Sequence, residues 1–139
     1  MPLRIVASER GLQRLEWNDD APVGPRMLVQ QAQVQLAEYF AGRRREFELP
    51  LDPIGTDFQQ RAWLALLEIP YGETRTYGEQ ARRLGLADGA RAIGSANARN
   101  PLPIVIPCHR LVGSAGKLTG YAGGLDYKEQ LLRLEGALH

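Results

Sequence analysis

The stretch NPLPIVIPCHR, residues 100–110, carries most of the information in this chain. Its prolines remove backbone donors and disfavour helical conformations, so we expect residues 101–107 to run extended. The residues between the prolines are apolar, which predicts that the segment is buried. The segment leads directly into Cys108, the only cysteine of the chain, which is followed by His109 and Arg110. A nucleophile, a titratable base and a fixed cation therefore follow a stiff apolar segment.

Two short helices joined by a tight turn are predicted immediately upstream of this stretch. Thr76 and Glu79 form a capping-box pattern that opens a helix over residues 77–84. Asp88 is expected to cap a second helix over residues 89–99. Helix, tight turn and helix make a helix-turn-helix outline.

Hydrophobic periodicity and turn residues predict the remaining elements. They are strands at 3–7 and 12–17, a helix at 27–41, an extended segment at 47–51, a helix capped by Thr56 and Gln59, and a final helix capped by Asp126 and Glu129. This order predicts an α+β protein. We expect a small β/α region at residues 1–53 and a mostly helical, winged-helix-like domain at residues 54–139.

Composition indicates a folded domain with little scope for metal or disulfide chemistry. Of 139 residues, 44% are hydrophobic and 24% are charged, close to the globular average. One cysteine cannot form an internal disulfide, and with only two histidines it is a poor set of zinc ligands, so we expect no metal. Neither a signal-peptide core nor a long apolar segment is visible, which predicts a cytoplasmic protein without membrane attachment.

Charge by itself does not identify a partner, because the net charge is only +1. The region from Gly72 to Arg110 holds six arginines against three acids. A basic face that binds nucleic acid and an ordinary solvated surface are both compatible with this distribution.

The chemistry of Cys108 also has two interpretations on residue types alone. A free thiol is mostly protonated at neutral pH, and a neighbouring base or cation raises its thiolate fraction, which is the nucleophilic form. His109 and Arg110 could serve in this way. The alternative is that the lone cysteine is a small buried hydrophobe beside a surface histidine, and residue types alone do not overturn it.

Longer motifs around Cys108 favour the reactive interpretation. IPCHR stands at residues 106–110, with NP at 100–101 upstream and GYAGG at 120–124 downstream. On these residues the chain closely resembles the O6-alkylguanine-DNA alkyltransferase (methylated-DNA–protein-cysteine methyltransferase) family. Further matches are GTDFQ at 55–59, IPYGET at 69–74, Tyr77, RAIG at 91–94 and LLRLEG at 131–136.

The resemblance implies a single-use transfer reaction. Cys108 would attack the alkyl carbon on guanine O6 and keep it as a thioether, which repairs the base in DNA without a cofactor. His109 would accept the thiol proton through a water, and Glu135 would orient the histidine. Tyr77 would donate a proton to the leaving guanine, and Asn100 would brace the turn that carries the cysteine.

The resemblance also implies how DNA is bound. The partner would be double-stranded DNA holding alkylated guanine, whose nucleotide is flipped into a pocket. Arg91 would insert into the base stack from a helix kept slim by small residues for the narrow minor groove. The implied DNA-binding residues are Arg91, Ala90, Tyr77, Gly94 and Arg110, and the implied pocket residues are Pro103, Leu111, Tyr121, Ala122 and Gly123. We expect a monomer.

Family members often carry a longer ribonuclease-H-like N-terminal domain than the roughly fifty residues here, so a compact version is implied.

One alternative function is that of a non-enzymatic relative that binds alkylated guanine and signals to other repair factors, although such proteins generally replace the cysteine. A helix-turn-helix transcription regulator would carry large polar residues for major-groove readout, where this helix has alanine and glycine. A thiol hydrolase is supported only by the Cys-His pair.

Overall fold

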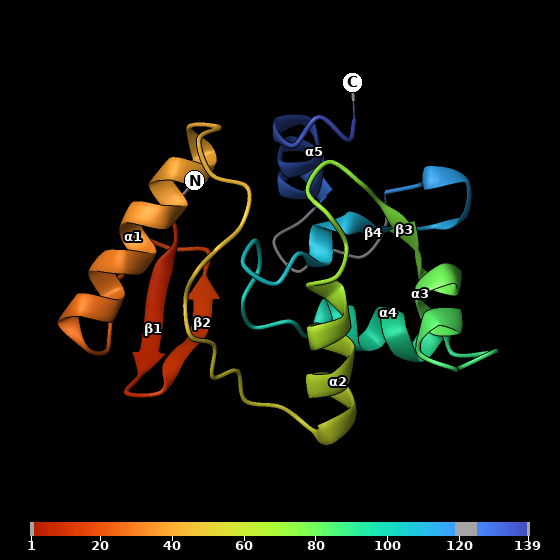
Figure 1. Cartoon of the computed structure of the whole chain (residues 1–139), viewed down its shortest axis with the longest axis horizontal. Coiled ribbons are helices and arrows are strands. Elements are labelled where there is room, and N and C mark those ends of the chain that lie inside the picture. The colour runs from red at the N-terminus through yellow and green to blue at the C-terminus, as the bar shows by residue number, and fades with distance from the viewer. Residues whose placement is uncertain (1, 119–124, 139) are drawn as a thin grey trace. The chain divides into compact units, whose positions relative to one another are not determined.

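The computed structural model describes residues 2–118 and 125–138, and the chain folds into two compact units at residues 1–54 and 55–139 (Figure 1). Each unit has its own core and is described by itself. No helix in the described ranges is both long and apolar enough to cross a lipid bilayer.

The first unit is a β-hairpin with one helix. Strands β1 (Arg4–Ser8) and β2 (Gly11–Glu16) pair antiparallel, as the alternating pattern predicts, with a bulge between Val6 and Ala7. Helix α1 (Arg26–Phe40) contacts β1 and buries its apolar stripe. The buried residues of α1 are Leu28, Val29, Ala32, Leu36 and Tyr39.

The extended segment predicted at residues 47–51 does not form a strand. Only Leu51 pairs, through an isolated parallel bridge with Leu12. Leu12 donates to the carbonyl of Pro50 at 2.9 Å, and Asp52 donates to the carbonyl of Leu12 at 2.7 Å. Because proline lacks a backbone donor, Pro50 interrupts any longer ladder.

The second unit is mostly helical. It contains α2 (Asp57–Leu66), β3 (Arg75–Thr76), α3 (Tyr77–Arg83), α4 (Ala90–Ala98), the 3₁₀ turn η1 (Cys108–Arg110), β4 (Leu111–Val112), the short turn η2 (Ser114–Gly116) and α5 (Leu125–Leu134). The capping boxes predicted at Thr56 and Thr76 are both present. These observations confirm the predicted α+β class and its mainly helical second part.

Helices α3 and α4 form the predicted helix-turn-helix pair. Gly85 follows α3 with a φ of 75°, the left-handed conformation that glycine adopts without strain. The predicted cap at Asp88 is wrong, because Gly89 occupies the N-cap position and no side chain caps α4. The first backbone amides of α4 therefore have no side-chain cap.

A parallel pairing that the sequence pattern does not predict joins two distant parts of this unit. β3 pairs with β4, with Arg75 opposite Leu111 and Thr76 opposite Val112. β3 runs directly into α3, and β4 directly follows η1. The pairing therefore brings the start of the helix-turn-helix to the turn that holds Cys108.

The segment at residues 101–107 is buried as predicted, but it is not extended. Its chain folds into tight turns, in which Ile106 donates to the carbonyl of Leu102 and Val105 to that of Pro103. Ile104 takes a φ of 75°, which is uncommon for a β-branched residue. The prolines exclude a regular helix, but they still allow single turns, and burial of the apolar side chains favours the compact form.

Candidate active site

The turn that carries Cys108 is buried and held by two asparagines. Cys108 is only 1% exposed. The side chain of Asn100 donates to the carbonyl of Ile106 at 2.9 Å and accepts from the backbone N–H of Leu102 at 3.0 Å. Asn97, from α4, donates to the carbonyl of Cys108 itself at 3.2 Å. The carbonyls of Ile106 and Cys108, which flank Pro107, are thus held by two asparagines at and just after the end of α4.

Cys108 is followed by a histidine that pairs with a buried carboxylate. His109 Nε2 lies 2.7 Å from Glu135 Oε2, and both side chains are inaccessible to solvent. Burial by itself would raise the pKa of Glu135, but hydrogen bonds from His109 and Arg110 outweigh it and lower this pKa to about 2. Glu135 is therefore an anion that only accepts hydrogen bonds, so His109 Nε2 is the donor.

This hydrogen bond fixes the tautomer of His109. With its proton on Nε2, a neutral imidazole presents Nδ1 as an acceptor. Nδ1 is buried and has no hydrogen-bond partner among residues 2–118 and 125–138. Burial lowers the pKa of His109 despite the opposing effect of Glu135, and the positive charges of Arg110 and Lys128 lower it further. The neutral ring, ready to accept a proton at Nδ1, is the favoured form.

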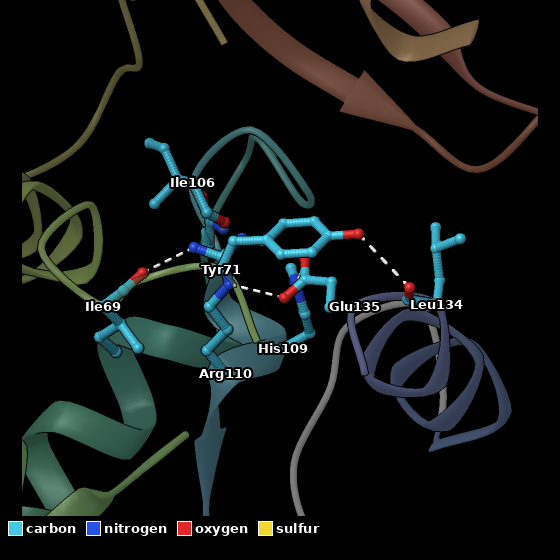
Figure 2. A network of polar contacts seen from close by, with 8 residues as sticks. Ile69, Tyr71, Ile106, His109, Arg110, Leu134 and Glu135 are labelled. Carbon is cyan, nitrogen blue, oxygen red and sulfur yellow. Dashed lines mark hydrogen bonds and ion pairs between the residues drawn. The ribbon is translucent and has the colours of Figure 1, made fainter. Parts of the chain in front are cut away.

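Arg110 lies inside the site instead of on a DNA-facing surface. It is 7% exposed, and it binds Glu135 with two donors, Nε at 2.8 Å and Nη2 at 3.0 Å. Its Nη1 donates to the carbonyl of Ile69 at 2.6 Å, as Figure 2 shows. The DNA contact predicted for Arg110 does not fit this position, since the guanidinium is occupied by internal acceptors. Its role is to hold Glu135 in place as a carboxylate.

Tyr71 closes the outer side of this network. Its hydroxyl donates to the carbonyl of Leu134 at 3.3 Å, and its ring centroid lies 5.7 Å from Arg110 Cζ (Figure 2). A cation over an aromatic face is favourable where water is excluded. The contact joins the end of α5 to the Arg110 side of the site.

Tyr77, the predicted proton donor, begins α3 and is half-buried. A Cβ built on Gly94 would lie 3.7 Å from Tyr77 Cδ1, so the ring packs against the backbone of α4 at that residue. Lys128 Nζ lies 5.9 Å from the centroid of the same ring. Tyr77 is thereby placed between α4 and α5.

The remaining predicted residues fall into two groups, one at the start of α4 and one beside the cysteine turn. Arg91 and Ala90 are exposed at the start of α4, and Gly94 follows one turn later. Pro103 and Leu111 are buried on either side of the cysteine turn. The predicted pocket residues Tyr121, Ala122 and Gly123 lie outside the described residues.

Two buried polar residues of the site are not predicted from the sequence: Lys128 and Asn97. A signal for the lysine exists, because Lys128, Leu131, Leu132 and Glu135 follow the i, i+3, i+4, i+7 spacing of one helix face. All four are buried. A lysine within an apolar stripe marks a buried cation that needs a partner. Among the described residues, no group of three or more histidine, cysteine, aspartate and glutamate side chains is placed to hold a metal ion.

Comparisons with known proteins agree with this geometry. The chain matches the family described as 6-O-methylguanine DNA methyltransferase, in its ribonuclease-like domain over residues 2–53 and in its DNA binding domain over residues 57–137. The methylated-DNA--protein-cysteine methyltransferase of Methanosarcina acetivorans is 47% identical over 144 residues, which cover 98% of this chain and 92% of that protein. Its counterpart from Mycolicibacterium paratuberculosis is 50% identical over 133 residues, covering 96% and 78%.

Solved structures have a similar fold. The crystal structure of Mycobacterium tuberculosis OGT in complex with DNA matches with a TM-score of 0.80 and 43% identity, covering 97% of this chain and 93% of that one. The S. pombe ATL in complex with DNA matches with a TM-score of 0.52 and 32% identity, covering 62% and 82%.

Proposed function

The chain belongs to the 6-O-methylguanine DNA methyltransferase family, and from this premise we propose that it repairs DNA by transferring the alkyl group of O6-alkylguanine to Cys108. The observation that carries the proposal is the buried His109–Glu135 pair directly after the buried Cys108, in which the histidine ring keeps Nδ1 as an acceptor. A thioether forms once and is not reversed, so each molecule acts a single time.

The reaction begins with activation of the thiol. The Cys108 proton passes to His109 Nδ1 through a water, and Glu135 keeps the ring in the required tautomer. The electron pair of the sulfur then forms a bond to the alkyl carbon. The bond between that carbon and guanine O6 breaks, and its electron pair stays with the base.

Departure of the base requires a proton, because negative charge develops on guanine. Tyr77 is the donor in this proposal, and its ring position between α4 and α5 supports that role. The proton taken from the thiol balances the proton delivered to the base. Asn100 and Asn97 keep the nucleophile in position by anchoring the carbonyls of the turn.

DNA binding is assigned to the helix-turn-helix. Arg91 is exposed at the start of α4 and can enter the stack in place of the flipped nucleotide. The small neighbours Ala90 and Gly94 suit the narrow minor groove. Pro103 and Leu111 supply part of the base pocket. A cytoplasmic location and a monomeric state stay predictions.

The direct test is transfer of mass. The protein is incubated with a duplex containing O6-methylguanine and, in parallel, with the same duplex containing guanine, and the intact protein mass is measured. We expect a gain of one methyl group only with the damaged duplex, at Cys108 by peptide mapping, and no gain in Cys108→Ala. Tight binding of the damaged duplex without any mass change would replace this proposal with a non-enzymatic sensor of alkylated guanine.

A further inference from the structure

Asn97 is a buried asparagine of which the proposed reaction uses only one end. Its exposure is 3%, and its Nδ2 donates to the carbonyl of Cys108 at 3.2 Å. Because a carbonyl oxygen only accepts hydrogen bonds, this contact fixes the orientation of the amide and makes its other end an acceptor. That acceptor, Oδ1, is buried and has no hydrogen-bond partner among residues 2–118 and 125–138.

An unpaired acceptor at this depth requires an explanation. Leaving a buried polar atom without a partner destabilises a fold, so native proteins keep few of them. Another such atom in the described part of the same unit is His109 Nδ1, and the proposed reaction uses it to accept the thiol proton. We therefore expect the oxygen of Asn97 to meet a donor during the reaction as well.

Asn97 lies on the face of α4 that meets the reacting groups. Ala90, Gly94 and Asn97 are spaced by four and three residues, so they share one face of the helix. The ring of Tyr77 packs against this face at Gly94, where a Cβ would lie 3.7 Å from Cδ1. Asn97 follows about one turn later and contacts the backbone of Cys108. The face therefore runs from the proposed proton donor to the nucleophile.

The alkyl group of the substrate has to lie at the nucleophile's end of this face. During transfer the alkyl carbon is between the sulfur of Cys108 and guanine O6, while Tyr77 delivers its proton to the base. The base is thus on the side of the tyrosine, and the alkyl group is on the side of the cysteine. Asn97 is the residue of α4 whose side chain binds the main chain of the cysteine.

We propose that Asn97 Oδ1 accepts a hydrogen bond from the hydroxyl of a hydroxyalkyl group on guanine O6, so that this chain prefers O6-hydroxyethylguanine to a substrate with an alkyl group of equal size and no hydroxyl. The inference rests on the proposed function and names a substrate class within it. A methyl group offers no donor, whereas the hydroxyl of a hydroxyethyl group stands one carbon beyond the carbon that is transferred. Asn97 thereby determines specificity for the alkyl group.

The transfer step itself is the same for both kinds of alkyl group. The sulfur lone pair of Cys108 forms the bond to the carbon next to O6. The bond between that carbon and O6 breaks, and its electron pair stays with the base, which receives a proton from Tyr77. The hydroxyl is carried to the protein unchanged, as part of a hydroxyethyl thioether.

Asn100 supplies the matched control, because its amide also holds the turn but has both ends paired. Its Nδ2 donates to the carbonyl of Ile106 at 2.9 Å, and its Oδ1 accepts from the backbone N–H of Leu102 at 3.0 Å. Asn100→Ala therefore weakens the turn without removing an unpaired acceptor. A change in alkyl preference that comes from the turn alone would appear in this variant too.

The test is a competition between two duplexes for a limiting amount of the full-length protein. One duplex carries O6-hydroxyethylguanine, and the other carries O6-propylguanine at the same position. Intact protein mass gives the ratio of the two adducts on Cys108, and this ratio does not depend on the fraction of active protein. The intrinsic reactivities of the two alkyl groups cancel when the ratio is compared between proteins.

Asn97→Leu removes the acceptor, so we expect it to lower the ratio of hydroxyethyl to propyl adduct about tenfold relative to the unsubstituted protein, which corresponds to the loss of one buried hydrogen bond. Asn97→Asp keeps an acceptor oxygen in either protonation state and should keep most of the preference. Asn100→Ala should slow both transfers and leave the ratio unchanged.

An unchanged ratio in Asn97→Leu would overturn the proposal even if both transfers became slower, because the amide would then serve only the carbonyl of Cys108. An equal change in Asn100→Ala would overturn it too. If circular dichroism shows that Asn97→Leu does not fold, Asn97→Ala takes its place in the comparison with Asn97→Asp.

The same proteins separate this inference from the proposed function. Normal transfer of a methyl group without any transfer of the hydroxyethyl group would refute the role of Asn97 alone. Failure of the unsubstituted protein to take up a methyl group would instead refute the proposed function.

Discussion

Replacing Glu135 with glutamine should remove the electrostatic centre of the active site while keeping its shape. The carboxylate accepts hydrogen bonds from His109 at 2.7 Å and from Arg110 at 2.8 and 3.0 Å. In Glu135→Gln the side-chain volume is retained, but the buried guanidinium loses its counter-charge. Breaking a buried ion pair from one side is strongly destabilising for this reason.

The size of the effect follows from the titration of Glu135. Burial alone would raise the pKa of this group, but the hydrogen bonds from His109 and Arg110 lower it from 4.5 to about 2. A carboxyl with a lower pKa in the folded state stabilises the protein above its unfolded-state pKa, and this contribution is lost as pH falls toward 2. The difference corresponds to about 3 kcal/mol at pH 7, of which about 1.4 kcal/mol is gone at pH 3.5.

Urea denaturation followed by circular dichroism measures this effect. At pH 7 we expect Glu135→Gln to lower the free energy of unfolding by about 3 kcal/mol. At pH 3.5 the gap between the two proteins should narrow by about 1.4 kcal/mol, because the unsubstituted protein itself loses stability.

The matched control is Glu129→Gln on α5, the helix that Glu135 directly follows. The side chain of Glu129 is 43% exposed and pairs with that of Arg133 at 2.8 Å, so its loss should cost less than about 0.5 kcal/mol. A gap for Glu135→Gln that stays constant between pH 7 and pH 3.5 would refute the assignment of Glu135 as a buried carboxylate. An equal cost for the two substitutions would refute it as well.

Three further substitutions test other parts of the second unit. Arg91→Ala should slow methyl transfer from duplex DNA about tenfold while leaving reaction with free O6-benzylguanine nearly unchanged, because only the duplex requires base flipping; the exposed Arg99→Ala is the control, and equal loss on both substrates would remove the role of Arg91. Asn100→Ala leaves two buried backbone groups unpaired, so urea denaturation should show a loss of about 2 kcal/mol, and an unchanged stability would contradict the brace. A Cβ on Gly55 would overlap Cη2 of the buried Trp63, so Gly55→Ala should cost about 1–3 kcal/mol in the same assay, whereas full stability would show that the indole moves freely.

Local sequence signals predict the regular elements well where one residue or one spacing controls them. The capping boxes at Thr56 and Thr76 are present because each depends only on contacts within four residues. Predictions fail where packing competes with local preference. Asp88 does not cap α4, and residues 101–107 turn instead of extending, since burial of the apolar side chains favours a compact path.

In the site too, local sequence signals predict some features and tertiary packing decides the others. Resemblance in the motifs is enough to single out Cys108, His109 and Glu135, and the structure brings the last two together although they are 26 residues apart. The motif does not determine the binding partners of Arg110. Its guanidinium donates to Glu135 and to the carbonyl of Ile69 inside the unit, where a DNA contact was predicted. Which acceptor a long side chain reaches depends on neighbours supplied by distant segments.

The stretch at residues 100–110 by itself determines that a nucleophilic residue type follows a chain that cannot continue a helix. It also places a base and a cation next to that residue. Only the tertiary structure decides which of these groups acts as base, counter-ion or support. The parallel β3–β4 pair brings Tyr77 to the turn. Lys128 from α5 and Glu135, which directly follows α5, reach the same turn from the C-terminal end of the unit. Reactivity depends on burial and on charges a few ångströms away, and those distances are set by packing between segments far apart in the sequence.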